Sequence, residues 1–431
     1  MRVDHGSFQK NRFSGLLAVG LPKQFALFFG IAVKKRPPWI LPVIIFSQFA
    51  GTSLWFSGNA VLADLQGKWS IGNHMLGFMT SAVQLGFIAG TLLFAFFALS
   101  DHFSPRIVFF VCSLLGAVSN ILIYLSAEGL TSLLVLRFIT GFFLAGIYPV
   151  GMKIAAGWYE KGLGEALGFL IGALVLGTAF PHLVKGAGQA VPWEVVIVST
   201  SAIASIGGIL MLLLVPDGPY LIKGTKFNSR AIFKIFQSKR LRAASFGYFG
   251  HMWELYTLWA FVPVILIAYE AQNPGTDINV SFWAFCIIAG GSLGCVLGGI
   301  ISTRAGSAPV AFIQLAGSGI CCLLSPLLFY APTEIFLGVL IFWGVMVVGD
   351  SPQFSAIIAR TAPRDLVGSA LTIVNCIGFS ITIVSIQVMG YLSNFMDLSN
   401  IFIFLVAGPV FGLTSLWPLL RTGHVPQTIK N

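Results

Sequence analysis

Residues 144–150 read Leu-Ala-Gly-Ile-Tyr-Pro-Val, and residues 347–353 read Val-Val-Gly-Asp-Ser-Pro-Gln. The glycine and the proline of the first stretch each recur 203 positions later in the second. Two other pairs of short stretches repeat in the same order at offsets of 202 and 204: Ser100-Asp101 with Ser302-Thr303, and Gly164-Glu-Ala-Leu167 with Gly368-Ser-Ala-Leu371. Because all three pairs recur at nearly the same offset, they indicate that the chain consists of two halves with the same architecture.

The composition places both halves in a lipid bilayer. Apolar residues make up 56% of the chain, charged residues 9%, and the mean hydropathy is +0.89, which would leave a water-soluble domain without a polar surface. The long unbroken apolar runs exclude a strand barrel. Runs near or above the ~18–20 residues that span hydrocarbon begin near Trp39, His74, Ile107, Thr131, Leu163, Trp193, Ala243, Phe282, Ala308, Glu334, Gly368 and Ile401. We therefore predict an all-α membrane protein with twelve transmembrane helices, arranged as two pseudo-symmetric six-helix bundles.

The basic residues predict which helix ends face the cytoplasm. The formal net charge is +10, and 21 of the 25 lysines and arginines fall on one side of the membrane when the N-terminus is placed inside. The other four are Lys68, Lys185, Arg137 and Lys153. This sorting follows the positive-inside rule and argues against nucleic acid as a partner. Both termini are therefore predicted to be cytoplasmic.

The longest internal gap between apolar runs opens with Pro216-Asp-Gly-Pro and carries seven basic residues. It predicts a cytoplasmic linker, whose charges either bind anionic lipid headgroups or act only as a topology signal on a solvated tether. Upstream, Phe13–Val33 is apolar but broken by Pro22 and Lys23, which favours a short interfacial segment. The predicted boundaries are 1–38 for the cytoplasmic N-terminal segment, 39–215 and 243–420 for the bundles, 216–242 for the linker and 421–431 for the cytoplasmic tail.

Motifs for nucleotide-driven or metal chemistry are missing from the sequence. No Walker loop, dinucleotide-type glycine motif or zinc-protease histidine pair occurs. The six cysteines all fall inside predicted spans without a Cys-x-x-Cys pair, so they are expected to be small packing residues. We expect no cofactor, no metal, no enzymatic activity and no transport driven by ATP hydrolysis on this chain.

Two acids lie deep in the predicted spans, where a charge costs at least ~2.5–3.5 kcal/mol. Glu254 lies ~16 Å along the seventh span, near the middle of a ~30 Å hydrocarbon core, and Asp350 lies nearer the cytoplasm in the tenth. His251 precedes Glu254 by three residues and shares its helix face. Because burial disfavours a charged carboxyl, this pair is the first candidate for proton coupling. The alternative is a static pair that only holds helices together.

Other polar residues of the spans are expected to line a cavity between the bundles. Arg137, in the fourth span, must meet an acid, a carbonyl or water, and it either holds an anionic substrate group or positions a coupling acid. The remaining candidates are aromatic residues of the seventh span and polar residues of four other spans: Tyr248, Phe249, Trp253, Tyr256 and Trp259, with Gln48, Thr52, Asn59, Gln84, Gln353, Asn375 and Gln387. Such a cavity suits a small polar or amphipathic solute.

The loop motifs resemble those of the major facilitator superfamily. That family carries Gly-x-x-x-Asp-Arg-x-Gly-Arg-Arg between spans two and three; residues 98–106 keep the aspartate and one basic residue but lack the glycines. Residues 298–306 keep glycines and the arginine, with Thr303 where an acid stands in the family. The stretch Arg137-Phe-Ile-Thr-Gly141 is similar to the family's Arg-x-x-x-Gly motif of span four.

This resemblance implies a cytoplasmic gate in which Asp101 accepts hydrogen bonds from Arg106 and Arg304 when the bundles close. The alternative is that these charges only end helices at the water boundary. The family's nitrate porters place arginines in spans two and eight, and its organophosphate exchangers in spans one and seven. This chain has no arginine in those four spans, which disfavours both substrate classes but leaves a monoanion open.

The repeat and the resemblance together imply a secondary transporter that rocks two bundles about a midplane site. We expect proton-coupled transport of a small organic solute, with a multidrug or metabolite exporter of the same fold as the alternative. A non-transporting membrane receptor and a membrane-embedded enzyme are alternatives of another class. The expected partners are the lipid bilayer, the solute and protons, and the expected state is a monomer in a bacterial inner membrane.

Overall fold

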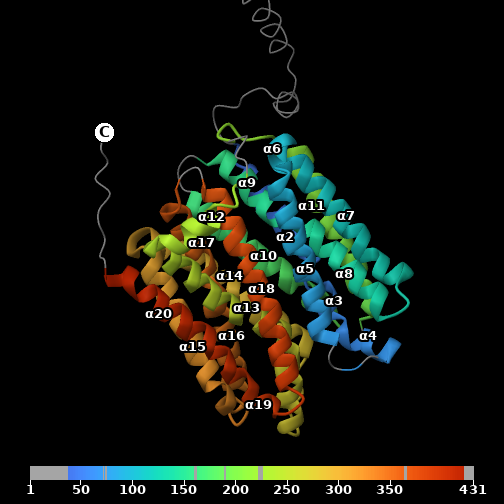
Figure 1. Cartoon of the computed structure of the whole chain (residues 1–431). Helices are drawn as coiled ribbons and strands as arrows, with labels where there is room; N and C mark the ends of the chain where they lie inside the picture. The colour runs from blue at the N-terminus through green and yellow to red at the C-terminus, as the bar shows by residue number, and fades with distance from the viewer. Residues whose placement is uncertain are drawn as a thin grey trace, which may run out of the picture.

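The computed structural model describes residues 37–421 except 71, 73–74, 160–162, 189–190, 222–226 and 364–365. All regular secondary structure in these residues is helical. The predicted interfacial segment Phe13–Val33 and nearly all of the predicted tail lie outside the described residues. Figure 1 shows the blue-to-green helices of the first half on one side of the molecule and the yellow-to-red helices of the second half on the other.

The first half contains α2 (Ile40–Thr52), α3 (Ser57–Ala60), α4 (Leu62–Trp69), α5 (Met75–Phe96), α6 (Leu99–His102), α7 (Pro105–Ser126), α8 (Leu130–Leu144), α9 (Tyr148–Trp158), α10 (Leu163–Lys185) and α11 (Trp193–Leu214). The second half contains α12 (Ala231–Gln237), α13 (Lys239–Gln272), α14 (Val280–Ala305), α15 (Ser307–Leu328), α16 (Thr333–Gly349), α17 (Ser351–Thr361), α18 (Val367–Leu392), α19 (Leu398–Ile401), the 3-10 helix η3 (Phe402–Val406) and α20 (Ala407–Arg421). We call the end with α6 and α12 the linker end and the end with α4 and α19 the far end (Figure 1).

The predicted membrane helices are confirmed. Eleven helical segments among the described residues are long and apolar enough to cross a membrane, and the shorter apolar helix α2 provides the twelfth. Helix α2 is too short to cross the membrane by itself, because the helix of the first span breaks at residues 53–56 and α3 resumes it. Helix α13 begins at Lys239, so the last residues of the predicted linker belong to its first turn.

The sequence repeat marks a helix break in each half. Spans four and ten divide into α8 with α9 and into α16 with α17, and the breaks fall on the repeated stretches. Pro149 and Pro352 both lie in the first turn of the helix that follows, where a missing N–H costs nothing. A Cβ on Gly146 would lie 2.2 Å from the Cys112 sulfur, and one on Gly349 would lie 2.3 Å from the Gln314 amide. Close packing therefore requires glycine at both breaks.

The two bundles meet along two helix pairs, α10 with α14 and α5 with α18. Small residues allow the first pair to approach, because Gly172 lies against Ser292. Two side-chain hydrogen bonds join the bundles near the far end: Gln387 Nε2 donates to Ser81 Oγ at 2.9 Å, and Asn279 Nδ2 donates to the Gly186 carbonyl at 3.1 Å. The far end is thus closed in this conformation.

Two glycines of α16 make a matched test of this packing. A Cβ on Gly344 would lie 1.9 Å from the Ile287 carbonyl oxygen, whereas a Cβ on Gly338 would have no neighbour within 4 Å. We expect Gly344→Ala to lower the stability of the purified protein by about 1–3 kcal/mol through overpacking, and Gly338→Ala to leave it unchanged. Thermal unfolding in detergent checks this. Equal melting temperatures for the two variants would contradict the packing of α14 on α16.

Candidate functional site

A small cavity lies between the bundles at the level of the two helix breaks. Its volume is about 20 Å³, enough for about one water molecule. Residues of both halves line it: Tyr148, Ile171, Leu174, Tyr248, Met252, Leu255, Tyr256, Trp259, Val348, Ser351 and Phe379. Tyr148 and Ser351 occupy equivalent positions of the repeat. The two helix breaks therefore present one residue each to a shared cavity.

An aromatic layer joins the bundles beside this cavity. The Trp55 ring stacks on Phe379 with centroids 5.6 Å apart and lies at the same distance from Tyr256. Phe56 contacts Trp259 edge to face at 6.2 Å, and Phe87 contacts Phe379 at 4.5 Å. Trp55 and Phe56 belong to the break of the first span, so this break, together with Phe87 of α5, supplies the first half's share of the layer.

His251 and Asp350 form a buried contact between a base and an acid beside the cavity. Their Nδ1 and Oδ1 atoms are 2.8 Å apart, and both side chains are 0% exposed. The rings of Tyr248 and Phe354 pack against the imidazole at 5.7 and 6.0 Å. Asp350 lies at the N-terminus of α17, whose dipole favours a negative charge, and the next residue, Ser351, lines the cavity. A proton gained or lost by this pair changes the charge next to the cavity.

Glu254 does not pair with His251, contrary to the prediction from their spacing. Its Oε1 accepts hydrogen bonds from the Ser318 hydroxyl, from Cys322 Sγ at 3.2 Å and from Trp343 Nε1 at 2.6 Å. The cavity-facing residues of α13 centre on Met252, and at 3.6 residues per turn Glu254, two residues later, points about 160° away from Met252. His251 lies on the flank of the face and Glu254 on its back, so Glu254 joins α13 to α15 and α16 instead.

Arg137 braces the break in the first span. Its Nη1 donates to the Leu54 carbonyl and to Ser57 Oγ, both at 3.0 Å, and its Nη2 donates to the Trp55 carbonyl. Asn120 Oδ1 lies 3.4 Å from the same Nη1. Of the partners expected for this residue, the structure shows carbonyls and not an acid. Arg137 therefore positions Trp55 in the aromatic layer from inside the first bundle.

The structure gives a different partner to the predicted gate aspartate. Asp101 pairs with Lys153 of α9, with Nζ and Oδ1 2.7 Å apart. Lys153 also donates to the Ser100 carbonyl at 3.0 Å. Arg106 and Arg304 form no ion pair with any described residue. In this conformation the predicted gate therefore contains an ion pair between Asp101 and Lys153, and both residues belong to the first half.

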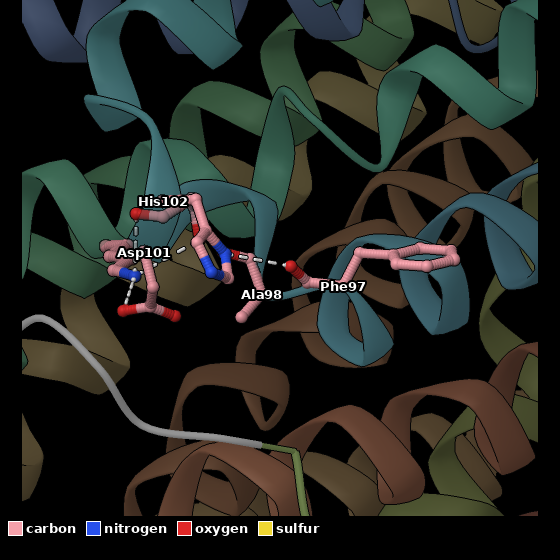
Figure 2. A network of polar contacts seen from close by, with 6 residues as sticks. Phe97, Ala98, Asp101 and His102 are labelled. Carbon is pink, nitrogen blue, oxygen red and sulfur yellow. Dashed lines mark hydrogen bonds and ion pairs between the residues drawn. The ribbon is translucent and has the colours of Figure 1, made fainter.

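His102 completes this corner of the linker end. Its Nδ1 lies 3.1 Å from the carbonyl oxygens of both Phe97 and Ala98, where α5 has ended and Ala98 takes a left-handed backbone conformation. Figure 2 shows the His102 ring directed at the Phe97 carbonyl, with the Asp101 carboxylate beside it on α6. The ring nitrogen thus faces two carbonyls at the end of α5, of which the Ala98 carbonyl also accepts the N–H groups of Asp101 and His102 at 2.8 and 3.0 Å.

Gln353 is buried in the first turn of α17, and its backbone N–H donates to the Asp350 carbonyl at 2.9 Å. The sequence does not predict Ser318, Cys322 and Trp343 as partners of Glu254, because no spacing rule connects three different helices. Tyr148 and Ser351 were likewise not predicted as cavity residues. Both residues occupy equivalent positions of the sequence repeat, and this equivalence is a signal from which they could have been found.

The comparison with known families shows to which protein family the chain belongs. The Major Facilitator Superfamily pattern matches residues 40–386. The chain belongs to the major facilitator superfamily. It is therefore an integral membrane transporter. No curated protein matches it in sequence.

Two solved structures show the same fold. One is the proton:xylose symporter XylE bound to 6-bromo-6-deoxy-D-glucose, with 13% identity and a TM-score of 0.70 over 88% of this chain and 95% of that one. The other is the human organic anion transporter MFSD10 (TETRAN), with 13% identity and a TM-score of 0.69 over 88% of this chain and 100% of that one. At this identity the likeness concerns the fold alone.

The role of Arg137 is open to a direct test. Arg137→Gln removes donors from the Leu54 and Trp55 carbonyls, which the surrounding bundle seals from water. Ser57 Oγ can still donate to the Leu54 carbonyl at 3.0 Å, so the main cost is about 1–3 kcal/mol for the Trp55 carbonyl left unpaired. We expect a clearly lower melting temperature in detergent. Arg360→Gln, which removes an exposed arginine of α17, is the matched control and is expected to melt like the wild type. A variant at Arg137 that melts like this control would show that the brace is dispensable.

Proposed function

We propose that this transporter couples proton movement to the passage of a small amphipathic organic solute through the cavity between its bundles. The observation that supports this proposal is the His251–Asp350 pair, a titratable acid and base 2.8 Å apart and sealed from water. It connects α13 to the break in span ten, which is an element expected to move during alternating access. XylE, which shares the fold, is a proton:xylose symporter.

The coupling follows from the cost of an unbalanced charge in hydrocarbon. With one proton shared between imidazole and carboxylate, the pair is neutral overall and can stay buried while the cavity is closed. When the bundles separate and water reaches the break, the pair can gain or lose a proton. The resulting net charge opposes closure until the proton balance is restored or the solute compensates it. Proton binding and bundle movement are thereby linked.

The cavity wall favours an amphipathic solute. It consists of aromatic and aliphatic side chains with one serine, and it contains no charged residue. Tyr148, Tyr248 and Tyr256 contribute hydroxyl groups that can bind a polar group of the solute. Arg137, the only arginine expected to meet an anionic solute, is occupied by backbone carbonyls. A neutral or cationic solute therefore fits better than the monoanion that the sequence left open, and the aromatic wall favours an exporter as the second candidate.

The proposal also includes the topology, the conformation and the oligomeric state of the protein. Both termini lie in the cytoplasm, the linker end is the cytoplasmic end, and the conformation described is closed toward the outside. The protein works as a monomer in a bacterial inner membrane.

Proton flux into proteoliposomes loaded with a pH dye tests the coupling. The panel holds sugars, amino acids, small carboxylates and amphipathic amines. We expect one class to drive a change of internal pH in the wild type, and we expect Asp350→Asn and His251→Gln to abolish it, because each substitution breaks the buried pair that carries the proton in this proposal.

Glu254→Gln is the matched control for these variants. Its amide oxygen can still accept the hydrogen bonds of Ser318 and Trp343, so we expect proton flux close to that of the wild type. Loss of coupling in Glu254→Gln with retention in Asp350→Asn would overturn the assignment. Flux of labelled solute without protons in the wild type would refute coupling altogether.

A further inference from the structure

The second half carries a basic and aromatic surface at the linker end. We call it the linker surface and define it by Arg230, Lys234, Lys239, Arg240, Arg242, Phe233 and Phe236. All five basic residues are exposed. The sequence has no acid between Asp217 and Glu254, and no ion pair among the described residues includes any of the five. Five neighbouring cations therefore lack a protein counter-charge in the described structure.

The stability of α13 does not explain where these charges lie. Lys239, Arg240 and Arg242 occupy its first turn, at the positive end of the helix dipole, where each cation is disfavoured by about 0.3–1 kcal/mol. The helix is already capped, because Ser238 Oγ accepts the Leu241 N–H at 3.3 Å. An external anion at this surface would offset the unfavourable placement of the three cations.

The aromatic residues indicate the kind of anion. Phe233 and Phe236 of α12 are 65% and 42% exposed, while Ala231 and Ile235 on the other side of the helix are buried against the bundle. Exposed phenylalanine rings among lysines and arginines are typical of a surface that lies in a membrane interface, with the rings toward the acyl boundary and the cations at the headgroups. A soluble anion would make no use of the rings.

We propose that the linker surface binds anionic phospholipid headgroups. The proposal goes beyond the transport function and does not depend on proton coupling. It also places the lipid at the joint between the bundles. The start of the linker is tied to the first half, where Trp158 Nε1 donates to the Pro216 carbonyl at 2.9 Å, and its later part is tied to the second, where the Asn228 N–H donates to Ser369 Oγ at 2.9 Å.

Native mass spectrometry of the full-length protein in detergent tests this proposal. The protein is titrated with phosphatidylglycerol or with phosphatidylcholine of the same acyl chains. We expect phosphatidylglycerol to bind more tightly, and we expect the triple variant Lys234→Gln, Lys239→Gln, Arg240→Gln to weaken it at least about 10-fold, since each basic residue near a surface contributes about 5-fold. Phosphatidylcholine binding is expected to be the same in both proteins.

The matched control is the triple variant Arg304→Gln, Arg360→Gln, Arg421→Gln, which removes three exposed charges elsewhere and is expected to keep most of the phosphatidylglycerol affinity. Equal losses in the two triple variants, or equal binding of the two lipids to the wild type, would overturn the proposal. Displacement of phosphatidylglycerol by an equal concentration of inorganic phosphate would also overturn it in favour of a free-phosphate surface. Added salt is also expected to weaken phosphatidylglycerol binding to the wild type. This measurement uses no variant, so a variant that misfolds cannot affect it.

Discussion

The cost of an unpaired charge or an open helix end inside hydrocarbon is the constraint on which this structure depends. Two of its buried charged residues, Arg137 and Asp350, meet this constraint at helix breaks. Arg137 donates to carbonyls that the break of the first span leaves free, and Asp350 lies at the N-terminus of the half-helix that begins after the break in span ten. The same two breaks contribute Trp55 and Phe56 to the aromatic layer and Ser351 to the cavity wall. Charge, broken helix and cavity therefore lie together, and in the proposed cycle this arrangement links solute passage to the protonation of a buried pair.

The repeat also shows how the two halves differ. An offset of 203 residues places Gln48 opposite His251, Ile147 opposite Asp350 and Gly151 opposite Phe354. In the first half Gln48 packs so closely on Gly151 that a Cβ there would lie 2.1 Å from its amide oxygen. The second half replaces this neutral contact with an ion pair and an aromatic ring. At these equivalent positions the first half thus holds neutral side chains and the second half a titratable pair, which suits a cycle in which one bundle carries the proton and the other supplies a complementary wall.

The membrane helices were predictable because each needs only a long apolar run, and the breaks in spans four and ten were visible as repeated glycine and proline. The break in the first span was not, since the hydroxyls of Thr52 and Ser53 that turn back to the Gln48 and Ala50 carbonyls carry no strong signal in a sequence rich in small residues. Without that break, the carbonyl partners of Arg137 stayed hidden. The partners of Glu254 were equally out of reach, because three helices distant in sequence bring them together. Spacing placed His251 and Glu254 on one helix side but could not tell which neighbouring helix each would meet.

Difference infrared spectroscopy of the carboxyl stretch, recorded as solute binds to the purified protein, tests the central claim most directly because it observes protonation itself. The account predicts a solute-induced change in a protonated-carboxyl band that disappears in Asp350→Asn and persists in Glu254→Gln. A band that vanishes in Glu254→Gln and persists in Asp350→Asn would place the proton on the back face of α13, away from the cavity, and would contradict the account.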